Sequence, residues 1–587
     1  MLLLHRHAHT SCSHFSHEDL SLPLELDRTV SHKVRHLSDH NIQLAETMFI
    51  LSSGPVTPSP AGRATAPLRG LETGENDVDQ MQNDERRRDV SADVAEAIAS
   101  ELETRTISHL SLLHSPTARH TIHLSSIEQC MPRSYIRMCL AYRVPDATRL
   151  PQILTCLDAF VRKLIDAKPY LSGFVVAVTG ANSPVGAVQI EFTDDDFLHY
   201  PCVTVRRLTR EEVPYTYDEL NQNGLPPSAI RPDLVSALGE AADQDRAPVF
   251  RVQANVLEGG LVVSLYLHHC ISDGTGMGLL MTGSVLNDDF AFDRHLDARG
   301  HDIPRLSLRL EAFAHHKSVL RQHLSYSFAN QINDRQLKCK TTNSAPQANN
   351  VAKPPGRGCV VAFPLSRLAT LKAMVEKYAD GHFITPNDVL QALIWQCMTK
   401  ARIASLRETT VTTSKLLIPI NIRNRLKRPL PESYFGAAID FASVQLPLSH
   451  LADTSLQMMA RTAMEIRKSI NKVDEPYIRQ AISLARFPDP QMDTRDLQAS
   501  NMDRVNGADM YITSWEKLRC YEATLEMGLG PPDWVRKPWS KDPGSCIILP
   551  YDKRKDYLEV VIQMTEEDMA RLLDDSTFME YVARVID

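Results

Sequence analysis

The chain has 587 residues, enough for more than one folded domain, and its formal net charge is −8. A mildly acidic chain without a basic stripe is a poor partner for nucleic acid or an anionic membrane surface, and no apolar run approaches the length of a membrane span. The 11 cysteines are scattered without CxxC spacing, which predicts free thiols in a reducing compartment. We therefore expect a cytoplasmic protein, because the apolar start at Met1–Leu4 is too short for a secretory signal.

Residues 1–117 lack the pattern of a folded domain and are expected to form a disordered N-terminal extension. The segment 54–62 is rich in Pro and Ser, and the segment 76–88 is dense in charge, so neither buries enough apolar surface to offset the entropy of ordering. The pattern allows one helix between Val90 and Leu113. The histidines and cysteine of residues 5–17 have no strand or helix pattern around them, so we interpret this segment as a solvated tail and predict no metal site.

From residue 118 onward, strand-like segments alternate with amphipathic ones. Residues 147–167 carry a helical apolar stripe, whereas 174–178 and 187–192 are typical of strands. The polar segment 330–358, which contains Pro and Gly, is the best candidate for a crossover linker. It would separate an N-terminal half at 118–329 from a C-terminal half at 359–587. The pattern predicts a mixed α/β (α+β) protein in two halves.

The C-terminal half continues the alternation of strands and helices. A helix is expected to begin at Pro386, because Thr385 is a good N-cap, Pro is favoured at the first helical position, and Asp388 completes a start like a capping box. The remaining predicted strands lie at 360–363, 415–420, 439–444, 511–514, 546–550 and 557–563, and the remaining helices at 366–378, 457–470 and from residue 566.

A β-hairpin is the most strongly patterned feature of the N-terminal half. Apolar and polar residues alternate along 250–256, which indicates a half-buried strand, and the sequence of 258–260 is typical of a tight turn. Neighbouring residues of a strand point to opposite faces, so His268 and His269 must point in opposite directions. His269 ends the apolar row that begins at Leu261, where water is scarce and the protonation state of an imidazole can be tuned.

Three residues separate His269 from Asp273, and a glycine follows at once. An imidazole at a strand end can act as a general base on an alcohol. The structural alternative is that His269 only ends a core strand and Asp273 only caps the next helix. Spacing alone does not decide, because short motifs recur by chance in a chain with 22 histidines. For His268 we favour a structural role.

These segments together resemble the BAHD acyltransferases of plants and fungi, which are part of the chloramphenicol-acetyltransferase-like superfamily. The resemblance covers residues 118–587 and depends on the order and spacing of several short segments rather than on any one of them. The family's second signature, D-F-G-W-G, is present only as Glu-Met-Gly-Leu-Gly at 526–530, and this variant is more similar to fungal members. The matching segments are Leu124–Gln129, Pro132–Tyr135, Pro169–Gly173, His269–Gly274, Ile384–Trp395, Asn421–Arg425, Pro431–Gly436 and Thr513–Trp515.

The resemblance implies two pseudo-equivalent domains with a tunnel between them, where an acyl-CoA and a small alcohol meet at His269. His269 would take the hydroxyl proton as the oxygen attacks the thioester, and no covalent enzyme intermediate would form. Asp273 would hold the histidine loop through an arginine, for which Arg423 and Arg425 are candidates. The second signature would lie away from the histidine and support the fold.

Two further residues are candidates for catalysis. The resemblance implies that the Thr513 hydroxyl or the Trp515 indole N–H donates a hydrogen bond to the oxyanion of the tetrahedral intermediate. The alternative for both is a packed strand with a core tryptophan. Acetyl-CoA is the favoured co-substrate and the acceptor is expected to be a hydroxylated secondary metabolite, with no permanently bound cofactor. A monomer is expected, because the two halves already complete the site.

Two alternative functions remain open from the sequence. His268-His269-x-x-x-Asp273-Gly274 also matches the HHxxxDG motif of peptide-synthetase condensation domains, which take thioesters from carrier proteins. A non-catalytic binding protein built on the same fold is the other alternative, and the altered second signature favours it mildly. No residue can be assigned to the CoA phosphates.

Overall fold

The structure is a computed structural model, and the described residues all belong to the unit 84–587. The predicted N-terminal extension and its helix at Val90–Leu113 lie outside the described residues, as does most of the predicted linker 330–358. The described residues are 118–179, 186–236, 238, 246–287, 319, 323, 326–328, 356–406, 411–486, 497–499, 508–538 and 544–587.

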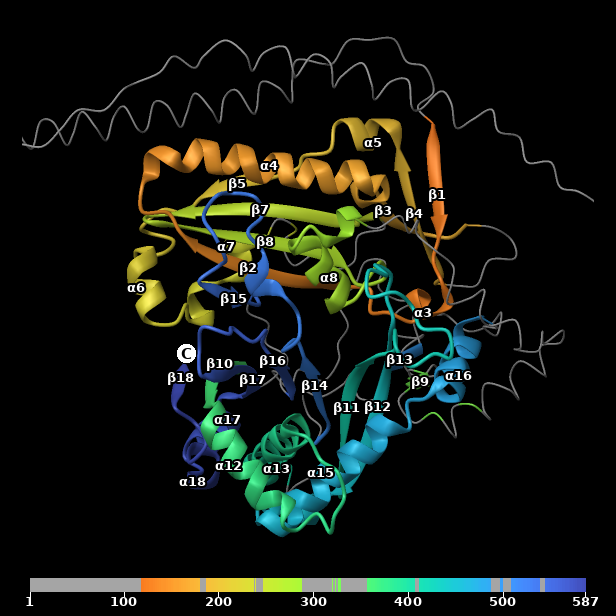
Figure 1. Cartoon of the computed structure of the whole chain (residues 1–587), viewed down its shortest axis with the longest axis vertical. Helices are drawn as coiled ribbons and strands as arrows, with labels where there is room; N and C mark the ends of the chain where they lie inside the picture. Colours follow the sequence, from red (N-terminus) through yellow and green to blue (C-terminus); the bar gives the residue numbers. More distant parts are fainter. Residues whose placement is uncertain are drawn as a thin grey trace, which may run out of the picture. The chain divides into compact units, whose positions relative to one another are not determined.

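The described residues form a mixed α/β fold built around two main sheets (Figure 1). The first is five-stranded and the second is seven-stranded, and a four-stranded sheet and a two-stranded ribbon accompany them. In the order of the strands across each sheet, the five-stranded sheet contains β15 (Trp534–Arg536), β2 (Tyr135–Arg143), β8 (Gly260–His268), β7 (Phe250–Leu257) and β5 (Thr204–Arg207). The seven-stranded sheet contains β12 (Ile439–Pro447), β11 (Thr413–Asn421), β14 (Met510–Ser514), β16 (Ser545–Ile548), β17 (Tyr557–Thr565), β10 (Gly356–Pro364) and β18 (Arg584–Ile586). The smaller sheets contain β1 (Arg119–His123), β4 (Val188–Thr193), β3 (Phe174–Ala177) and β6 (Arg246–Pro248), and β13 (Leu497–Ala499) with β9 (Tyr326–Phe328).

Helices cover the two main sheets. Figure 1 shows α4 lying along the five-stranded sheet, and α12, α13, α15 and α17 gathered beside the seven-stranded sheet. No helix of the described residues has the length and apolar character needed to cross a membrane. The helices before residue 300 are α3 (Ser126–Gln129), α4 (Leu150–Ala167), α5 (Asp194–Leu198), α6 (Tyr217–Gln222), α7 (Pro232–Val235) and α8 (Gly274–Met281). The later ones are α12 (Leu365–Glu376), α13 (Pro386–Leu406), α14 (Leu448–Ala452), α15 (Leu456–Asn471), α16 (Glu475–Arg486), α17 (Glu566–Leu573) and α18 (Ser576–Met579).

The start of α13 has the capping geometry that the sequence predicts. The Thr385 hydroxyl accepts a hydrogen bond from the Asp388 backbone N–H at 3.3 Å, and an Asp388 carboxylate oxygen accepts one from the Thr385 N–H at 2.7 Å. Arg467 of α15 then binds the same carboxylate. A helix that is buried on most of its faces has little apolar periodicity, so this cap is the clearest local signal of where α13 begins.

The predicted hairpin is present as β7 and β8, joined at Glu258 and Gly259. Gly259 has φ of +79°, a conformation that glycine adopts without steric cost. The prediction of a half-buried strand at 250–256 is wrong, because every residue of β7 except Arg251 is buried, as is every residue of β8. The second face is covered by a smaller apolar cluster around Tyr217 of α6, and its polar side chains bond to one another; for example, the Asn255 amide donates to the Ser264 hydroxyl at 3.1 Å.

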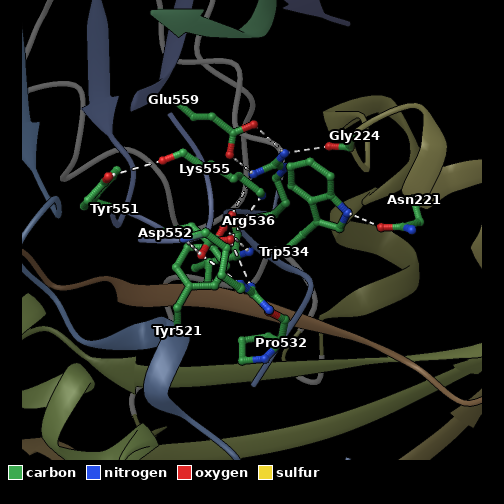
Figure 2. Close-up of polar contacts among 12 residues, drawn as sticks. Asn221, Gly224, Tyr521, Pro532, Trp534, Arg536, Tyr551, Asp552, Lys555 and Glu559 are labelled. Atoms are coloured by element: carbon green, nitrogen blue, oxygen red, sulfur yellow. Dashed lines mark hydrogen bonds and ion pairs between the residues drawn. The ribbon is translucent and has the colours of Figure 1, made fainter. Parts of the chain in front are cut away.

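One strand of the C-terminal half belongs to the sheet of the N-terminal half. β15 pairs antiparallel with β2, and Arg536 lies opposite Cys139. Figure 2 shows how this strand is anchored: the buried Arg536 guanidinium binds the Glu559 carboxylate with both groups bidentate, at 2.8 and 2.9 Å, and donates to the Gly224 carbonyl at 2.6 Å. Trp534 donates its indole N–H to Asn221 at 2.7 Å. Through Arg536 and Trp534, these contacts connect β17 of the C-terminal half to α6 and the residues after it in the N-terminal half.

Candidate active site

The end of β8 presents His269 to a cavity. The backbone N–H of His268 donates to Val249 and that of His269 donates to Ser134, at 2.9 and 2.7 Å, so both neighbouring segments hold the strand end. The chain turns at Cys270 and enters α8 at Gly274. The two histidines separate as predicted: the His269 side chain is among those that line the cavity, whereas His268 is buried with its ring edge-on to Tyr135, at a centroid distance of 5.1 Å.

The cavity has a volume of about 280 Å³ and lies where the two main sheets meet. One wall comes from the start of β2 and from the turn that carries His269. The opposite wall comes from strands β11, β12, β14 and β16 of the seven-stranded sheet, and each of these contributes residues two apart, as the alternation of side chains along a strand requires. These residues are Pro419 and Asn421 of β11, Ile439 and Phe441 of β12, Tyr511 and Thr513 of β14, and Ser545 and Ile547 of β16.

Burial keeps the imidazole of His269 neutral. Burial lowers the pKa of His269 below its ordinary value, and the charge of Asp273 opposes this only in part. The Nδ1 atom is buried and forms no hydrogen bond of ordinary geometry with the described residues, although backbone groups of His269 and Ser272 lie close enough to the ring to raise its pKa in part. For His268, burial and the nearby Arg133 lower the pKa to about 3. Both rings are therefore uncharged near neutral pH, and the ring of His269 lines the cavity as a free base.

Asp273 fixes the turn that follows His269. Its carboxylate accepts from the Gly276 N–H at 3.1 Å, which caps α8, and from the Ala438 N–H at 2.9 Å. Arg423 donates to both of its oxygens, at 2.8 and 3.1 Å. Burial disfavours the charged form, but Arg423 and the backbone donors outweigh this, so the pKa of Asp273 lies below its ordinary value.

The structure confirms the predicted Asp–Arg contact and chooses between the two candidate arginines. Arg423 binds Asp273, whereas the hydrogen bonds of Arg425 go to the carbonyls of Ile470 and Val473. Asp273 therefore both caps the helix and pairs with the arginine. The sequence analysis had given these two roles of Asp273 as alternatives. The salt bridge also joins a residue of the N-terminal half to one of the C-terminal half.

Glycines keep this turn compact. A Cβ atom on Gly276 would meet the Ser272 side chain and would lie 2.7 Å from the Phe435 carbonyl oxygen. A Cβ on Gly278, one half-turn further along α8, would meet nothing within 4 Å. Only the first glycine is therefore required by close packing, and it lets the loop around Phe435 approach the histidine turn.

Thr513 and Trp515 lie in the same cavity as His269. Thr513 and Tyr511 are on the cavity face of β14, and Ile512 between them is buried in the core. The backbone N–H of Trp515 donates to Ile548 at 2.8 Å, and its indole Nε1 would be 3.6 Å from a Cβ placed on Gly274. The structure thus brings together all four residues that the sequence nominated, from segments more than 200 residues apart.

The segment 526–530, the altered second signature, is not among the residues that line the cavity. Met527 is buried, and Glu526 forms an ion pair of 2.5 Å with Lys163 of α4 in which both side chains are about half exposed. An exposed ion pair contributes little to stability, so the motif contributes mainly through its buried methionine and its turn. Its position agrees with the expected role in supporting the fold.

Sequence reasoning did not nominate several residues of the cavity wall, among them Asn421, Arg137 and Lys537. Asn421 lines the cavity, accepts from Arg423 and donates to the Thr275 hydroxyl at 3.3 Å. Arg137 and Lys537 also line it and add two positive charges. No local pattern marks these residues, because β2 and β15 are far apart in the sequence and become neighbours only in the sheet. The described residues hold no cluster of His, Cys, Asp or Glu that could bind a metal ion.

Comparison with known proteins identifies the family. The sequence profile of the Transferase family matches residues 212–579, and that of the trichothecene 3-O-acetyltransferase-like N-terminal domain matches residues 134–284. The chain belongs to the Transferase family. This confirms the BAHD-type acyltransferase family that the motifs indicated. The first match extends over more than half of the chain and includes both the His269–Asp273 motif and the Thr513–Trp515 strand.

The relatives are acyltransferases of fungi. The eremophilane O-acetyltransferase of Penicillium roqueforti is 23% identical over 478 residues, covering 78% of this chain and 97% of that protein. The O-acyltransferase of Monascus ruber is 26% identical over 461 residues, with coverage of 76% and 95%. The predicted class of enzyme, an acyltransferase that moves groups other than aminoacyl groups, agrees with these relatives.

Solved structures confirm the predicted two-domain fold. The trichothecene 3-O-acetyltransferase of Fusarium sporotrichioides, solved with coenzyme A and T-2, has a TM-score of 0.60 at 20% identity and covers 80% of this chain and 100% of its own. The corresponding protein of F. graminearum, solved with coenzyme A and deoxynivalenol, has the same TM-score at 18% identity and the same coverage. Those proteins bind coenzyme A and a small molecule together.

Proposed function

We propose that this protein transfers an acyl group, in the first instance acetyl, from acyl-CoA to a hydroxyl group of a small secondary metabolite. The observation that carries the proposal is the neutral imidazole of His269, which lines a cavity between the two sheets. The relatives named as O-acetyltransferases support the reaction class, and the trichothecene acetyltransferases with bound coenzyme A support the donor.

His269 acts as the general base in this mechanism. It takes the acceptor's hydroxyl proton while the oxygen attacks the thioester carbonyl, and the protonated imidazole then gives that proton to the leaving CoA thiolate. The O–C bond forms, the C–S bond breaks, and no acyl-enzyme is needed. Burial disfavours the imidazolium, so the proton is held only briefly and is passed on readily.

The other nominated residues act on the same step. The Thr513 hydroxyl or the Trp515 indole N–H donates to the oxyanion that forms when the carbonyl is attacked. Asp273 does not touch the reacting atoms. It is a positioning residue, because its hydrogen bonds fix the turn between β8 and α8 through Arg423 and two backbone N–H groups.

The test is release of free thiol from acetyl-CoA in the presence of hydroxylated terpenoids and polyketides. Acceptor-dependent release by the wild type, lost in His269→Ala, is expected. His199→Ala is the matched control, because His199 is exposed at the end of α5 and should leave turnover unchanged. Equal release by the wild type and His269→Ala, or no release with acetyl-, malonyl- or longer acyl-CoA, would refute the proposal and favour carrier-bound thioesters or a binding role.

A further inference from the structure

The side-chain amide of Asn421, which lines the cavity, has only one orientation that suits its neighbours. Its Oδ1 atom accepts from the backbone N–H of Arg423 at 3.0 Å and from the Arg423 guanidinium at 3.3 Å. Both of those groups can only donate, so the amide atom that faces them must be the oxygen. The Nδ2 atom then faces Thr275 and donates to its hydroxyl at 3.3 Å.

The Thr275 hydroxyl is left with a proton to donate. A hydroxyl carries one donor and two acceptor lone pairs, and here the oxygen accepts the Asn421 N–H. Across the described part of the chain, no protein group accepts the proton of this hydroxyl. Thr275 is partly buried and lines the same cavity as His269. Its donor is therefore available to a ligand atom that enters the cavity.

The first turn of α8 connects Thr275 to the histidine turn. Asp273 is the N-cap of this helix and Thr275 is its second residue, so the contacts that fix Asp273 also fix the backbone of Thr275. Arg423 binds Asp273 through both carboxylate oxygens. Asn421, two residues earlier in the same segment of the C-terminal half, binds Thr275. The hydroxyl is thus held in a defined place beside the turn that presents His269.

Further donors reach this place from the C-terminal half. The indole Nε1 of Trp515 would lie 3.6 Å from a Cβ atom on Gly274, the residue that precedes Thr275. Thr513, on β14, lines the same cavity. A ligand atom next to Gly274 can therefore be approached by a hydrogen-bond donor from each half.

The chemistry of acyl transfer indicates which ligand atom the hydroxyl binds. Attack on the thioester turns its carbonyl oxygen into an oxyanion, and a hydrogen bond to a charged oxygen is about twice as strong as one to a neutral oxygen. A fixed donor at that atom stabilises the transition state more than the ground state, so it raises kcat. The attacking oxygen is a poorer partner, because it loses electron density to the carbonyl carbon as the new bond forms.

We propose that the Thr275 hydroxyl is a catalytic donor to the thioester carbonyl oxygen and to its oxyanion, and that Asn421 is a positioning residue that turns the hydroxyl proton into the cavity. The inference rests on the proposed acyl transfer and deepens it, because the oxyanion is then held from both halves. Thr275 keeps its proton throughout, and the proton that moves is the one that His269 carries from the acceptor to the CoA thiolate.

The experiment compares thiol release by Thr275→Val and Thr275→Ser, with acetyl-CoA and an acceptor that the wild type uses. We expect Thr275→Val to lower kcat by roughly 10²–10³ while both KM values change by less than about threefold. Thr275→Ser keeps the hydroxyl, so its kcat should stay within about tenfold of the wild type. Thr282→Val is the matched control and should keep wild-type kcat. Thr282 is beside the other end of α8, and its hydroxyl donates to the Gly278 carbonyl at 2.9 Å.

Asn421→Asp tests the direction of the bond between Asn421 and Thr275. A carboxylate still accepts from Arg423, but it cannot donate to Thr275, so the hydroxyl proton would turn toward it and away from the cavity. We expect a loss of kcat close to that of Thr275→Val. The double variant Thr275→Val/Asn421→Asp should lose no more than the larger single loss, because both changes remove the same donor. Losses that multiply would overturn the role of Asn421, since the new charge itself would then slow the reaction.

A binding measurement shows whether the cavity of Thr275→Val is intact. Ethyl-CoA has no carbonyl group, so in calorimetric titrations it should bind the wild type and Thr275→Val equally. Weaker binding of ethyl-CoA by Thr275→Val, wild-type kcat in that variant, or an effect confined to the KM of the acceptor would overturn the inference. So would an equal loss of kcat in Thr282→Val. Thiol release that Thr275→Val retains would refute only this inference, whereas no release by the wild type from any acyl-CoA would refute the acyl transfer and the inference with it.

Discussion

Replacing Arg423 with methionine should disrupt the histidine turn more than any other single change to a residue that does not touch substrate. Arg423 is almost fully buried, and its guanidinium makes two bonds to Asp273 and further bonds to the carbonyls of Tyr434 and Gly436. Methionine fills much of the same volume but donates nothing. The carboxylate of Asp273 would remain buried with only the N–H groups of Gly276 and Ala438 as donors.

The loss of stability expected for Arg423→Met can be estimated from the hydrogen-bond partners that Asp273 and the neighbouring carbonyls lose. Removing one member of a buried ion pair destabilises a protein by about 3–5 kcal/mol, because the other charge is left uncompensated. The orphaned carbonyls of Tyr434 and Gly436 add to this. Arg423→Lys should lose somewhat less free energy of unfolding than Arg423→Met. A single ammonium keeps the charge, but it cannot bind both oxygens of Asp273 at once.

Urea unfolding followed by tryptophan fluorescence measures the stability, and thiol release measures kcat. The double variant Asp273→Asn/Arg423→Met closes the cycle, and it should be less destabilised than the sum of the single variants because no charge is left buried. A loss below about 1 kcal/mol for Arg423→Met with unchanged kcat would refute the reasoning, since it would mean that the pair neither stabilises the turn nor positions His269.

Three further outcomes are expected. The depressed pKa of His269 means that the neutral base persists below the ordinary histidine value of about 6.5, so the acid limb of a kcat/KM profile should lie below that pH; a limb above 6.5 would contradict this. Gly276→Ala should unfold at least ~1 kcal/mol more easily in urea, whereas Gly278→Ala should be neutral or stabilising, because only the first Cβ meets packed atoms; equal effects would contradict this. If the Thr513 hydroxyl donates to the oxyanion, Thr513→Val should lower kcat by roughly 10²–10³ with little change in KM. If the Trp515 indole is the donor, Trp515→Phe should have this effect instead. Wild-type kcat in both variants would exclude both donors.

Acid should also weaken the fold through Asp273. Its folded pKa lies below the unfolded value of about 3.9, so the stability that its ionised form provides is complete above that pH. This stability is lost as the pH falls through the folded pKa. In Asp273→Asn, this part of the acid sensitivity should be absent from urea midpoints measured between pH 5 and pH 2, and an unchanged pH dependence would show that other groups carry it.

The histidine could be placed from sequence because its signals are local. Alternation along β7 and β8, a glycine turn and the apolar row that His269 ends all lie within about 20 residues, and strand geometry then decides which histidine points where. The alternation along β7 did not predict correctly which of its side chains are exposed to solvent. Gln253 and Asn255 are polar and read as solvent-facing, yet they are buried because α6 and its neighbours cover that face and the two side chains hydrogen-bond to each other at 2.7 Å.

The partners of the histidine turn could not be derived from the local pattern. Arg423 and Thr513 were named only because their segments resemble those of a family, and nothing in their own neighbourhoods indicates which atoms they meet. Arg137 and Lys537 were missed because nothing in their local sequence indicates which residues they meet, and the resemblance to the family did not point to them either. Their proximity depends on a strand of three residues, β15, that is too short to show a pattern and joins the sheet of the other half.

The same contacts hold the halves together and shape the site. Arg423 of the C-terminal half binds Asp273 of the N-terminal half close to His269, and Arg536 anchors β15 immediately before Lys537. Both ion pairs are buried, but only the Arg423–Asp273 pair crosses between the halves, so separating the halves would leave a buried charge unpaired on each side. Arg536 contacts the N-terminal half through its bond to the Gly224 carbonyl. The cavity therefore has its present form only when the halves are joined, which explains why residues so distant in sequence make up a single site.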